Sequence, residues 1–150
     1  MISIKERKPP EKREGRIDLA LRKVTSRGKG WRMLVDPQGQ ASITDYRVLA
    51  ETDGLCLIEC HPRTGRTHQI RVHLASIGHP VLGDRLYGAG FATKAARLPG
   101  SQRALVEAFP RQALHAWLLG FEHPVTGETP RFESDPPADM AALIDALGTI

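Results

Sequence analysis

The sequence predicts one α+β domain built around a largely antiparallel, mixed sheet with flanking helices. Two observations favour this class: segments that alternate apolar and polar residues outnumber segments with helical spacing, and the links between them are short. The chain has 150 residues, 41% of them hydrophobic, which is enough for one buried core and too short for two full domains. We therefore expect residues 15–150 to fold as one unit behind a basic lead-in at residues 1–14.

The lead-in at residues 1–14 places charged side chains around two consecutive prolines and offers little apolar surface. Such a segment cannot offset its ordering entropy by burial, so we expect it to be extended and flexible. Extended segments are predicted next at residues 17–24 and 31–35, with a glycine-containing turn between them. Residues 36–39 predict a tight turn, because proline presets its own φ angle and glycine accepts a positive one.

Residues 41–50 and 55–61 alternate in polarity, which predicts two strands. The link between them contains an aspartate and a glycine, which are typical of a tight hairpin, so the strands are expected to pair antiparallel. The apolar spacing then changes to steps of three and four. This change predicts a helix over residues 68–76, with Thr67 as its N-cap and Gly78 as its end.

The rest of the chain begins with a weakly periodic stretch at residues 89–112, which predicts a long surface insertion containing a short helix. Residues 114–122 and 129–134 predict another strand pair. Residues 139–147 predict a closing helix, and its buried stripe is expected to consist of Met140, Leu143, Ile144 and Leu147.

Cysteine content and hydropathy exclude several classes of protein. With only Cys56 and Cys60 present, neither a disulfide framework nor a four-thiolate zinc site can form within the chain. No apolar run approaches the roughly 18 residues of a membrane span, and the N-terminus lacks a secretory signal. We expect a soluble protein of the reducing cytoplasm with no membrane role.

Positive charge is concentrated at the N-terminus. Residues 1–32 contain eleven lysines and arginines against four acidic residues, a net charge of +7, although the whole chain carries only +4. A basic arm on a nearly neutral body is typical of a protein that binds phosphate backbones. The alternative is a solvated tail with no ligand.

A dense group of polar residues, Arg66, His68, Gln69 and Arg71, lies around the start of the predicted helix. Helix N-termini favour anions, and guanidinium groups add bidentate binding of phosphate or carboxylate, so an anion or phosphate site is predicted. The alternative is that Arg71 caps the helix or pairs with a nearby carboxylate. The clustering favours function, since perturbed polar groups gather at functional sites.

No metal site is expected. His68 and His73 are five residues apart and would point to different faces of a helix, and no HExxH motif is present. Asp84, in the run Gly-Asp-Arg-Leu-Tyr-Gly, has the chemistry of a general base or nucleophile. A turn-forming role for Asp84 is favoured over both.

The run RTGRTHQIRVHLASIGHPVLGDRLYG at residues 63–88 closely resembles the RluA-type family of RNA pseudouridine synthases. The resemblance continues in a strand with Gly39, Ala41, Thr44 and Tyr46, in the Leu-His-Ala run at residues 114–116, and in the His-Pro-x-Thr-Gly turn at residues 123–127. It implies a cleft across a mainly antiparallel sheet and the conversion of uridine to pseudouridine in ribosomal or transfer RNA, with no cofactor or metal. The residues that it implies for RNA or cleft binding are Arg66, Thr67, His68, Gln69, Arg71 and His73.

The resembled family carries its nucleophilic aspartate in an HRLDxxTSG motif and a tyrosine in a KxYxA motif, and neither motif occurs here. We therefore expect the C-terminal part of a synthase catalytic domain, with no nucleophile and with the N-terminal half as a possible partner. Arg71 matches the family arginine that pairs with the aspartate, so Arg71 is expected to lack its partner and the chain to be poorly stable. Alone, the chain is expected to be inactive.

Two alternatives to an enzyme part remain open at this point. The first is a non-catalytic RNA-binding module that keeps the same fold, whose RNA binding would weaken steeply with salt. A decaying gene fragment is the second alternative. The sequence does not identify the target uridine.

Overall fold

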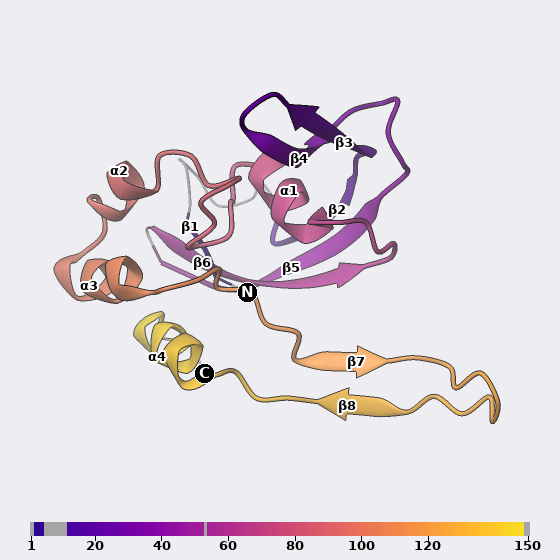
Figure 1. Ribbon diagram of the computed structural model, residues 1–150. Helices are drawn as coiled ribbons and strands as arrows, with labels where there is room; N and C mark the ends of the chain where they lie inside the picture. The colour runs from indigo at the N-terminus through magenta and orange to yellow at the C-terminus, as the bar shows by residue number, and fades with distance from the viewer. Residues whose placement is uncertain (1, 5–11, 53, 149–150) are drawn as a thin grey trace.

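The computed structural model describes residues 2–4, 12–52 and 54–148. Every pair of described strands is antiparallel, and the helices lie around the strands (Figure 1), which confirms the α+β class. In chain order the elements are β1 (Ile2–Ile4), β2 (Glu14–Asp18), β3 (Leu21–Ser26), β4 (Gly30–Val35), β5 (Ile43–Glu51), β6 (Leu55–Pro62), α1 (Gln69–Ser76), α2 (Phe91–Ala95), α3 (Gly100–Ala108), β7 (Leu118–Gly120), β8 (Arg131–Glu133) and α4 (Ala138–Ala146).

The central sheet has the strand order β1-β6-β5-β2, and two separate hairpins, β3-β4 and β7-β8, complete the strands. The predicted β5-β6 hairpin is confirmed, with Thr44 opposite Pro62 and Glu51 opposite Cys56. In Figure 1 the β3-β4 hairpin lies beside α1, and the β7-β8 hairpin extends away from the rest of the chain. The central sheet and the helices packed against it therefore form the body of the molecule.

The beginning of the chain differs from the prediction. Ile2–Ile4 form β1, which pairs with β6, and Glu14 already belongs to β2, so both ends of the predicted flexible lead-in take part in the sheet. Residues 5–11 lie outside the described residues. The single strand predicted at residues 17–24 is divided into β2 and β3, because Leu19 bonds to Ser42 while Leu21 turns into the other sheet.

Because of a β-bulge at Leu49, the two halves of β5 pack into two different hydrophobic clusters, one on each face of the sheet. Val48 lies opposite Ile58 and Ala50 lies opposite Leu57, so one extra residue separates the two pairs. A bulge shifts the alternation by one residue, which places Val48 with the α1 side and Ala50 with the α3 and α4 side. Both sheet faces are therefore apolar over part of their length.

Helix α1 ends as predicted but begins differently. Gly78 has φ +79°, its N–H donates to Ala75 O, and the N–H of His79 donates to Leu74 O, the paired bonds of a Schellman C-cap. The predicted N-cap Thr67 is wrong. The cap is His68, in the left-handed conformation, and it makes no side-chain capping bond.

The second half of the chain also differs in detail. The region predicted as a surface insertion with one short helix contains two helices, and Ala95, Leu98 and Val106 from it are buried in the core. Strands β7 and β8 have three residues each and are shorter than predicted. The closing helix is confirmed with its stripe, in which Ile144 is partly buried. Within the described residues, none of the helices combines the length and apolar character required to cross a bilayer.

Gly83 offers a test of this packing, because it has φ +78° and a Cβ at this position would collide with the carbonyl of Arg111. We expect Gly83→Ala to lower the free energy of unfolding by about 2–4 kcal/mol, through overpacking and a strained backbone. Gly65→Ala is the matched control, since a Cβ there meets no atom within 4 Å. Urea unfolding of both variants tests this; equal stability would contradict the packing described.

Candidate functional site

The motif residues divide into an internal group and a surface group. Gln69 belongs to the internal group and is only 4% exposed. Its Oε1 accepts bonds from Thr64 Oγ1 (2.7 Å) and the Arg66 N–H (3.0 Å). Its Nε2 donates to Ile43 O (2.9 Å) and Thr44 Oγ1 (3.0 Å). All four bonding positions of the amide are used inside the protein, so Gln69 anchors the loop before α1 to β5.

His73, the second internal residue, is fully buried. Its Nε2 lies 2.9 Å from Leu19 O, an acceptor, so this nitrogen carries the proton. Its Nδ1 therefore accepts the Thr44 hydroxyl at 2.8 Å. Burial lowers the pKa of His73, against the smaller opposing effects of Leu19 and Asp18. The imidazole is neutral and joins α1 to β5 and to the end of β2.

Arg71 and Asp84 form a bidentate ion pair. Arg71 Nε donates to Oδ2 at 2.7 Å and Nη2 donates to Oδ1 at 2.9 Å, and the side chains are 14% and 0% exposed. Oδ1 also accepts the N–H groups of Leu86 and Tyr87, at 3.0 and 3.1 Å. Burial raises the pKa of Asp84, but these bonds outweigh it and hold the pKa below its usual value.

This pair corrects one prediction and confirms another. Arg71 was expected to lack a carboxylate partner, and the expected instability depended on that; in the structure Arg71 is paired with Asp84. The alternative that Arg71 pairs with a nearby carboxylate is therefore the one the structure supports. The turn-forming role predicted for Asp84 is confirmed by its bonds to the backbone of the turn.

His68, at the surface, connects α1 to the β3-β4 hairpin. Its Nδ1 lies 2.9 Å from the Tyr87 hydroxyl, which also accepts the N–H of Met33 at 3.0 Å. Its ring stacks on Trp31, with the ring centroids 5.2 Å apart and the planes at 21°. Burial, followed by the nearby Arg71 charge, lowers the pKa of His68. Neither Trp31 nor Tyr87 was among the predicted site residues. The signals in the sequence were an aromatic residue within a basic hairpin and the Leu-Tyr-Gly run at residues 86–88.

Arg66 and Thr67 are exposed. Arg66 Nε donates to Ala41 O at 3.1 Å, which places this guanidinium just before the start of β5. The predicted anion site combined Arg66 with Arg71 at the start of α1. The structure does not provide it in that form, because Arg71 is engaged by Asp84. Among the described residues, no three histidine, cysteine, aspartate or glutamate side chains converge as a metal site.

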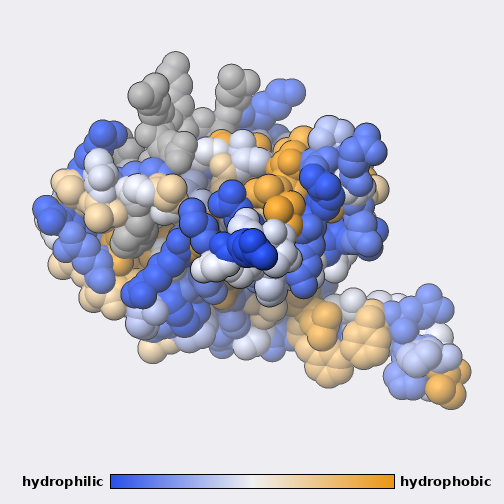
Figure 2. Space-filling view, turned by 45° about the horizontal axis from the view of Figure 1, so that its top comes forward, coloured by the Kyte–Doolittle hydropathy of each residue, from blue (hydrophilic) through white to orange (hydrophobic). Residues whose placement is uncertain are grey.

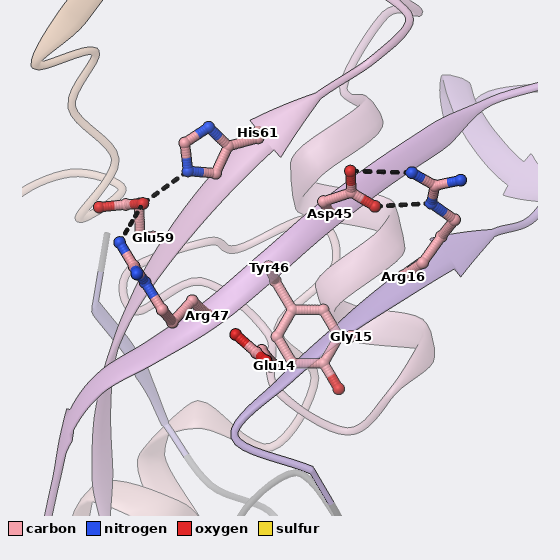
Figure 3. Close-up of a pocket in the computed structure, with 8 residues that line it drawn as sticks. All are labelled: Glu14, Gly15, Arg16, Asp45, Tyr46, Arg47, Glu59 and His61. Atoms are coloured by element: carbon pink, nitrogen blue, oxygen red, sulfur yellow. Dashed lines mark hydrogen bonds and ion pairs between the residues drawn. The ribbon is translucent and has the colours of Figure 1, made fainter.

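A charged groove of about 530 Å³ lies on the sheet (Figure 3), and none of its lining residues was among the predicted site residues. Two ion-pair clusters line it, Arg16 with Asp45, and Arg47 and His61 with Glu59. Arg63, which is not a lining residue, also binds Asp45. The hydrogen bond from Arg16 is the main cause of a depressed pKa at Asp45, as that from His61 is at Glu59. The signal in the sequence was the charge alternation along β5 and β6. The residues lining the groove are Glu14, Gly15, Arg16, Asp45, Tyr46, Arg47, Glu59 and His61.

The β7-β8 hairpin carries exposed apolar side chains far from the core. Figure 2 shows it projecting from the body with hydrophobic atoms on its surface. Leu119 is 58% exposed and Phe132 is 56% exposed, and the rings of Phe121 and Phe132 stack at 6.1 Å. An isolated two-stranded hairpin is marginally stable in water, so this apolar surface is suited to being covered by another polypeptide.

Comparison with known proteins identifies relatives for this fold and these motifs. A sequence model described as RNA pseudouridylate synthase matches residues 4–76. Ribosomal large subunit pseudouridine synthase D of Zymomonas mobilis is 39% identical over 136 residues, covering 89% of this chain and 40% of that protein. The protein of the same name from Nitrosomonas europaea is 47% identical over 116 residues, covering 77% and 32%. The chain therefore spans less than half the length of these relatives.

Solved structures agree with the sequence comparison. Human RNA pseudouridylate synthase domain containing 1 superposes with a TM-score of 0.65 at 28% identity, covering 91% of this chain and 53% of that one. Human RNA pseudouridylate synthase domain containing 4 gives a TM-score of 0.70 at 23% identity, covering 98% and 60%. The second likeness shows a shared fold.

The buried pair predicts strong energetic coupling between Arg71 and Asp84. We expect Arg71→Met and Asp84→Asn each to cost about 3–5 kcal/mol of unfolding free energy, because each leaves a buried partner uncompensated, and the double variant to cost much less than their sum. The exposed pair Arg103 and Glu107 is the control and should couple by about 0.5 kcal/mol or less. Chemical unfolding of both mutant cycles tests this; similar coupling in both would contradict a buried pair.

The buried imidazole of His73 predicts a pH-dependent stability. Its folded pKa lies below the ordinary 6.5, so the unfolded chain binds the proton more readily. The contribution is complete above pH 6.5 and is lost as the pH falls toward the folded pKa. We expect the free energy of unfolding to decrease between pH 7.5 and 5.5, by at most about 1.4 kcal/mol per unit from this group.

His73→Gln keeps an amide donor for Leu19 and removes the titration. This variant should be less stable at pH 7.5 and should lose less stability on acidification, and the remaining slope should include His68, whose pKa is also lowered. Urea titrations across the pH range measure both effects. An unchanged slope in His73→Gln would show that His73 does not cause it.

Proposed function

Because the chain belongs to the RNA pseudouridylate synthase family, we propose that it forms the downstream part of a catalytic domain that converts uridine to pseudouridine in ribosomal RNA. The observation that carries this proposal is the 39–47% identity to ribosomal large subunit synthases across the span that contains α1 and the Asp84 turn. Ribosomal RNA is favoured over transfer RNA on the names of these relatives. Their action on ribosomal RNA also favours a cytoplasmic location for this protein.

Arg71 is proposed to orient the nucleophilic carboxylate. Asp84 holds the guanidinium by Nε and Nη2, and within the described part of the chain Nη1 makes no hydrogen bond to protein. A guanidinium presents donors in a planar fork, so the Nη1 side can bind a second carboxylate while Asp84 keeps the group in place. Asp84 is thus a positioning residue, and the nucleophile is a carboxylate supplied from outside this sequence.

The aspartate-bearing polypeptide is proposed to dock next to the central sheet. The exposed β7-β8 hairpin and the open charged groove support this, because both present side chains suited to a protein surface. The arginines of the groove are already paired with carboxylates within the chain, so they add little net charge for docking. The hairpin instead offers exposed apolar surface that a partner can bury. Burial of the exposed Phe121 and Phe132 rings of this hairpin would supply most of the docking free energy.

A second candidate function is a non-catalytic RNA-binding module. The observation that favours it is the β3-β4 hairpin, where the segment from residue 21 to 35 contains five basic residues and no acidic one. Phosphate binding by such a segment does not require the nucleophile. Both functions have RNA as the partner. They differ in whether uridine is converted to pseudouridine once the polypeptide with the nucleophilic aspartate is added.

Release of tritium from a ribosomal RNA transcript labelled at uridine carbon 5 separates the two. The chain alone should release none, and adding the upstream part of the Zymomonas mobilis relative, where the resembled family carries its HRLD motif, should restore release. The same part with its motif aspartate changed to asparagine is the control. Release by the chain alone would contradict an external nucleophile, and none after complementation would leave RNA binding as the function.

A further inference from the structure

We propose that Trp31 is a stacking platform for an unpaired nucleobase of the bound RNA, with His68 as its support and Lys23 as its phosphate-binding neighbour. The inference rests on the proposed RNA function and deepens it, because it assigns a site for a single-stranded segment on the β3-β4 hairpin. The ring of Trp31 lies on the hairpin, apart from Gln69, His73 and the Arg71–Asp84 pair, and its support His68 is bonded to Tyr87 in the turn that Asp84 organises.

Trp31 is held at the surface rather than buried in the core. Along the same face of the hairpin, Leu21 and Met33 are 0% and 6% exposed, whereas Trp31 is 41% exposed. Val35 on this face is as exposed as Trp31, at 41%, so exposure alone does not indicate a ligand; the ring together with its support and the surrounding charge does. Gly30 precedes Trp31 with φ +74°, and this turn places the ring at the start of β4.

The ring is fixed from one side by a supporting chain of contacts. His68 stacks on Trp31 at 5.2 Å, and the His68 imidazole is bonded to the Tyr87 hydroxyl at 2.9 Å. Tyr87 in turn receives the N–H of Met33 and belongs to the turn organised by Asp84. A preorganised aromatic ring loses little conformational entropy when a base stacks on it.

His68 itself is in a strained conformation. Its φ of 54° makes it the one non-glycine residue with a positive φ among those described. Such conformations are retained where surrounding contacts overdetermine them, and they gather at ligand sites. Here the strain places the imidazole between Trp31 and Tyr87, where it supports the indole.

The charge around Trp31 is that of a nucleic-acid site. The hairpin carries Arg22, Lys23, Arg27, Lys29 and Arg32 with no acidic residue, and of these Arg22 is paired with Asp36. The Lys23 ammonium lies over a face of the Trp31 ring, 4.4 Å from its centroid, on an exposed side chain that a base stacking on that face would displace toward the phosphates. An aromatic ring flanked by cations matches the alternation of bases and phosphates in a single strand.

Single-stranded RNA fits these features better than an acidic protein. The cations would serve either partner, but a flat exposed ring with a stacked support is matched by the π-face of a base. Paired bases are already stacked within a duplex and cannot reach the ring. The site is therefore expected to bind unpaired bases with little sequence preference.

Tryptophan fluorescence provides a direct test, because the chain has only two tryptophans. In the full chain carrying Trp117→Phe, all tryptophan emission comes from Trp31. Titration at about 0.1 M salt, where the Debye length is near 10 Å, would use a short single-stranded RNA, the same RNA as a duplex, heparin and polyglutamate. We expect the single strand to quench the emission, and heparin and polyglutamate to bind without comparable quenching.

Affinity measurements complete the test. Trp31→Ala should weaken single-strand binding by about 5- to 150-fold, the usual effect of removing one stacking ring, and Trp31→Phe should restore most of it. Trp117→Phe, which alters an exposed ring on the other hairpin, should leave affinity unchanged. Circular dichroism and thermal melts establish that each variant is folded.

The outcomes separate this inference from the proposed function. Tight RNA binding with no quenching, or with equal affinity in Trp31→Ala, overturns the stacking platform and leaves the proposed function standing. Equal quenching by polyglutamate and RNA identifies a protein-binding surface and also overturns the platform. Absence of RNA binding by the folded chain at low salt overturns both.

Discussion

The carboxylate of Asp84 organises the chemistry-bearing side of this protein. It neutralises a nearly buried arginine, accepts two backbone N–H groups of its own turn, and thereby sets the position of Tyr87. Tyr87 then contacts both the β3-β4 hairpin and His68. A single buried anion thus connects α1, the following turn and the hairpin. Buried charges are tolerated in proteins when they are paired and hydrogen-bonded, and here the Asp84 carboxylate accepts two bonds from Arg71 and two from the backbone.

A second, uncharged network fixes the same helix from the opposite direction. Thr44 lies between Gln69 and His73, and these bonds attach α1 to β5 with no exposed component. Buried polar groups of this kind specify one arrangement, because any displacement leaves a donor or acceptor unpaired. Helix α1 is therefore held by an ion pair on one side and by a neutral hydrogen-bond network on the other. The exposed residues Arg66 and Thr67 sit on a rigid base.

The sequence and the structure agree where local patterning decides the outcome. Alternation in β5 and β6, the glycine stop of α1 and the stripe of α4 were all readable, because they follow from backbone geometry and residue type. The division of the first predicted strand into β2 and β3 was not, since both segments are locally extended and only their partners differ. The bulge at Leu49 likewise depends on the opposing strand.

By itself the sequence determined the α+β class, the antiparallel β5-β6 pair and the motif that relates the chain to RNA pseudouridylate synthases. Tertiary structure alone decided that Arg71 is paired, that Gln69 and His73 are internal, and that Trp31 lies against His68. The physical reason is the distance along the sequence over which each kind of interaction acts. Periodicity and turn chemistry act over a few residues, whereas ion pairs and ring stacks join residues that are distant in sequence, and folding alone brings them within contact distance.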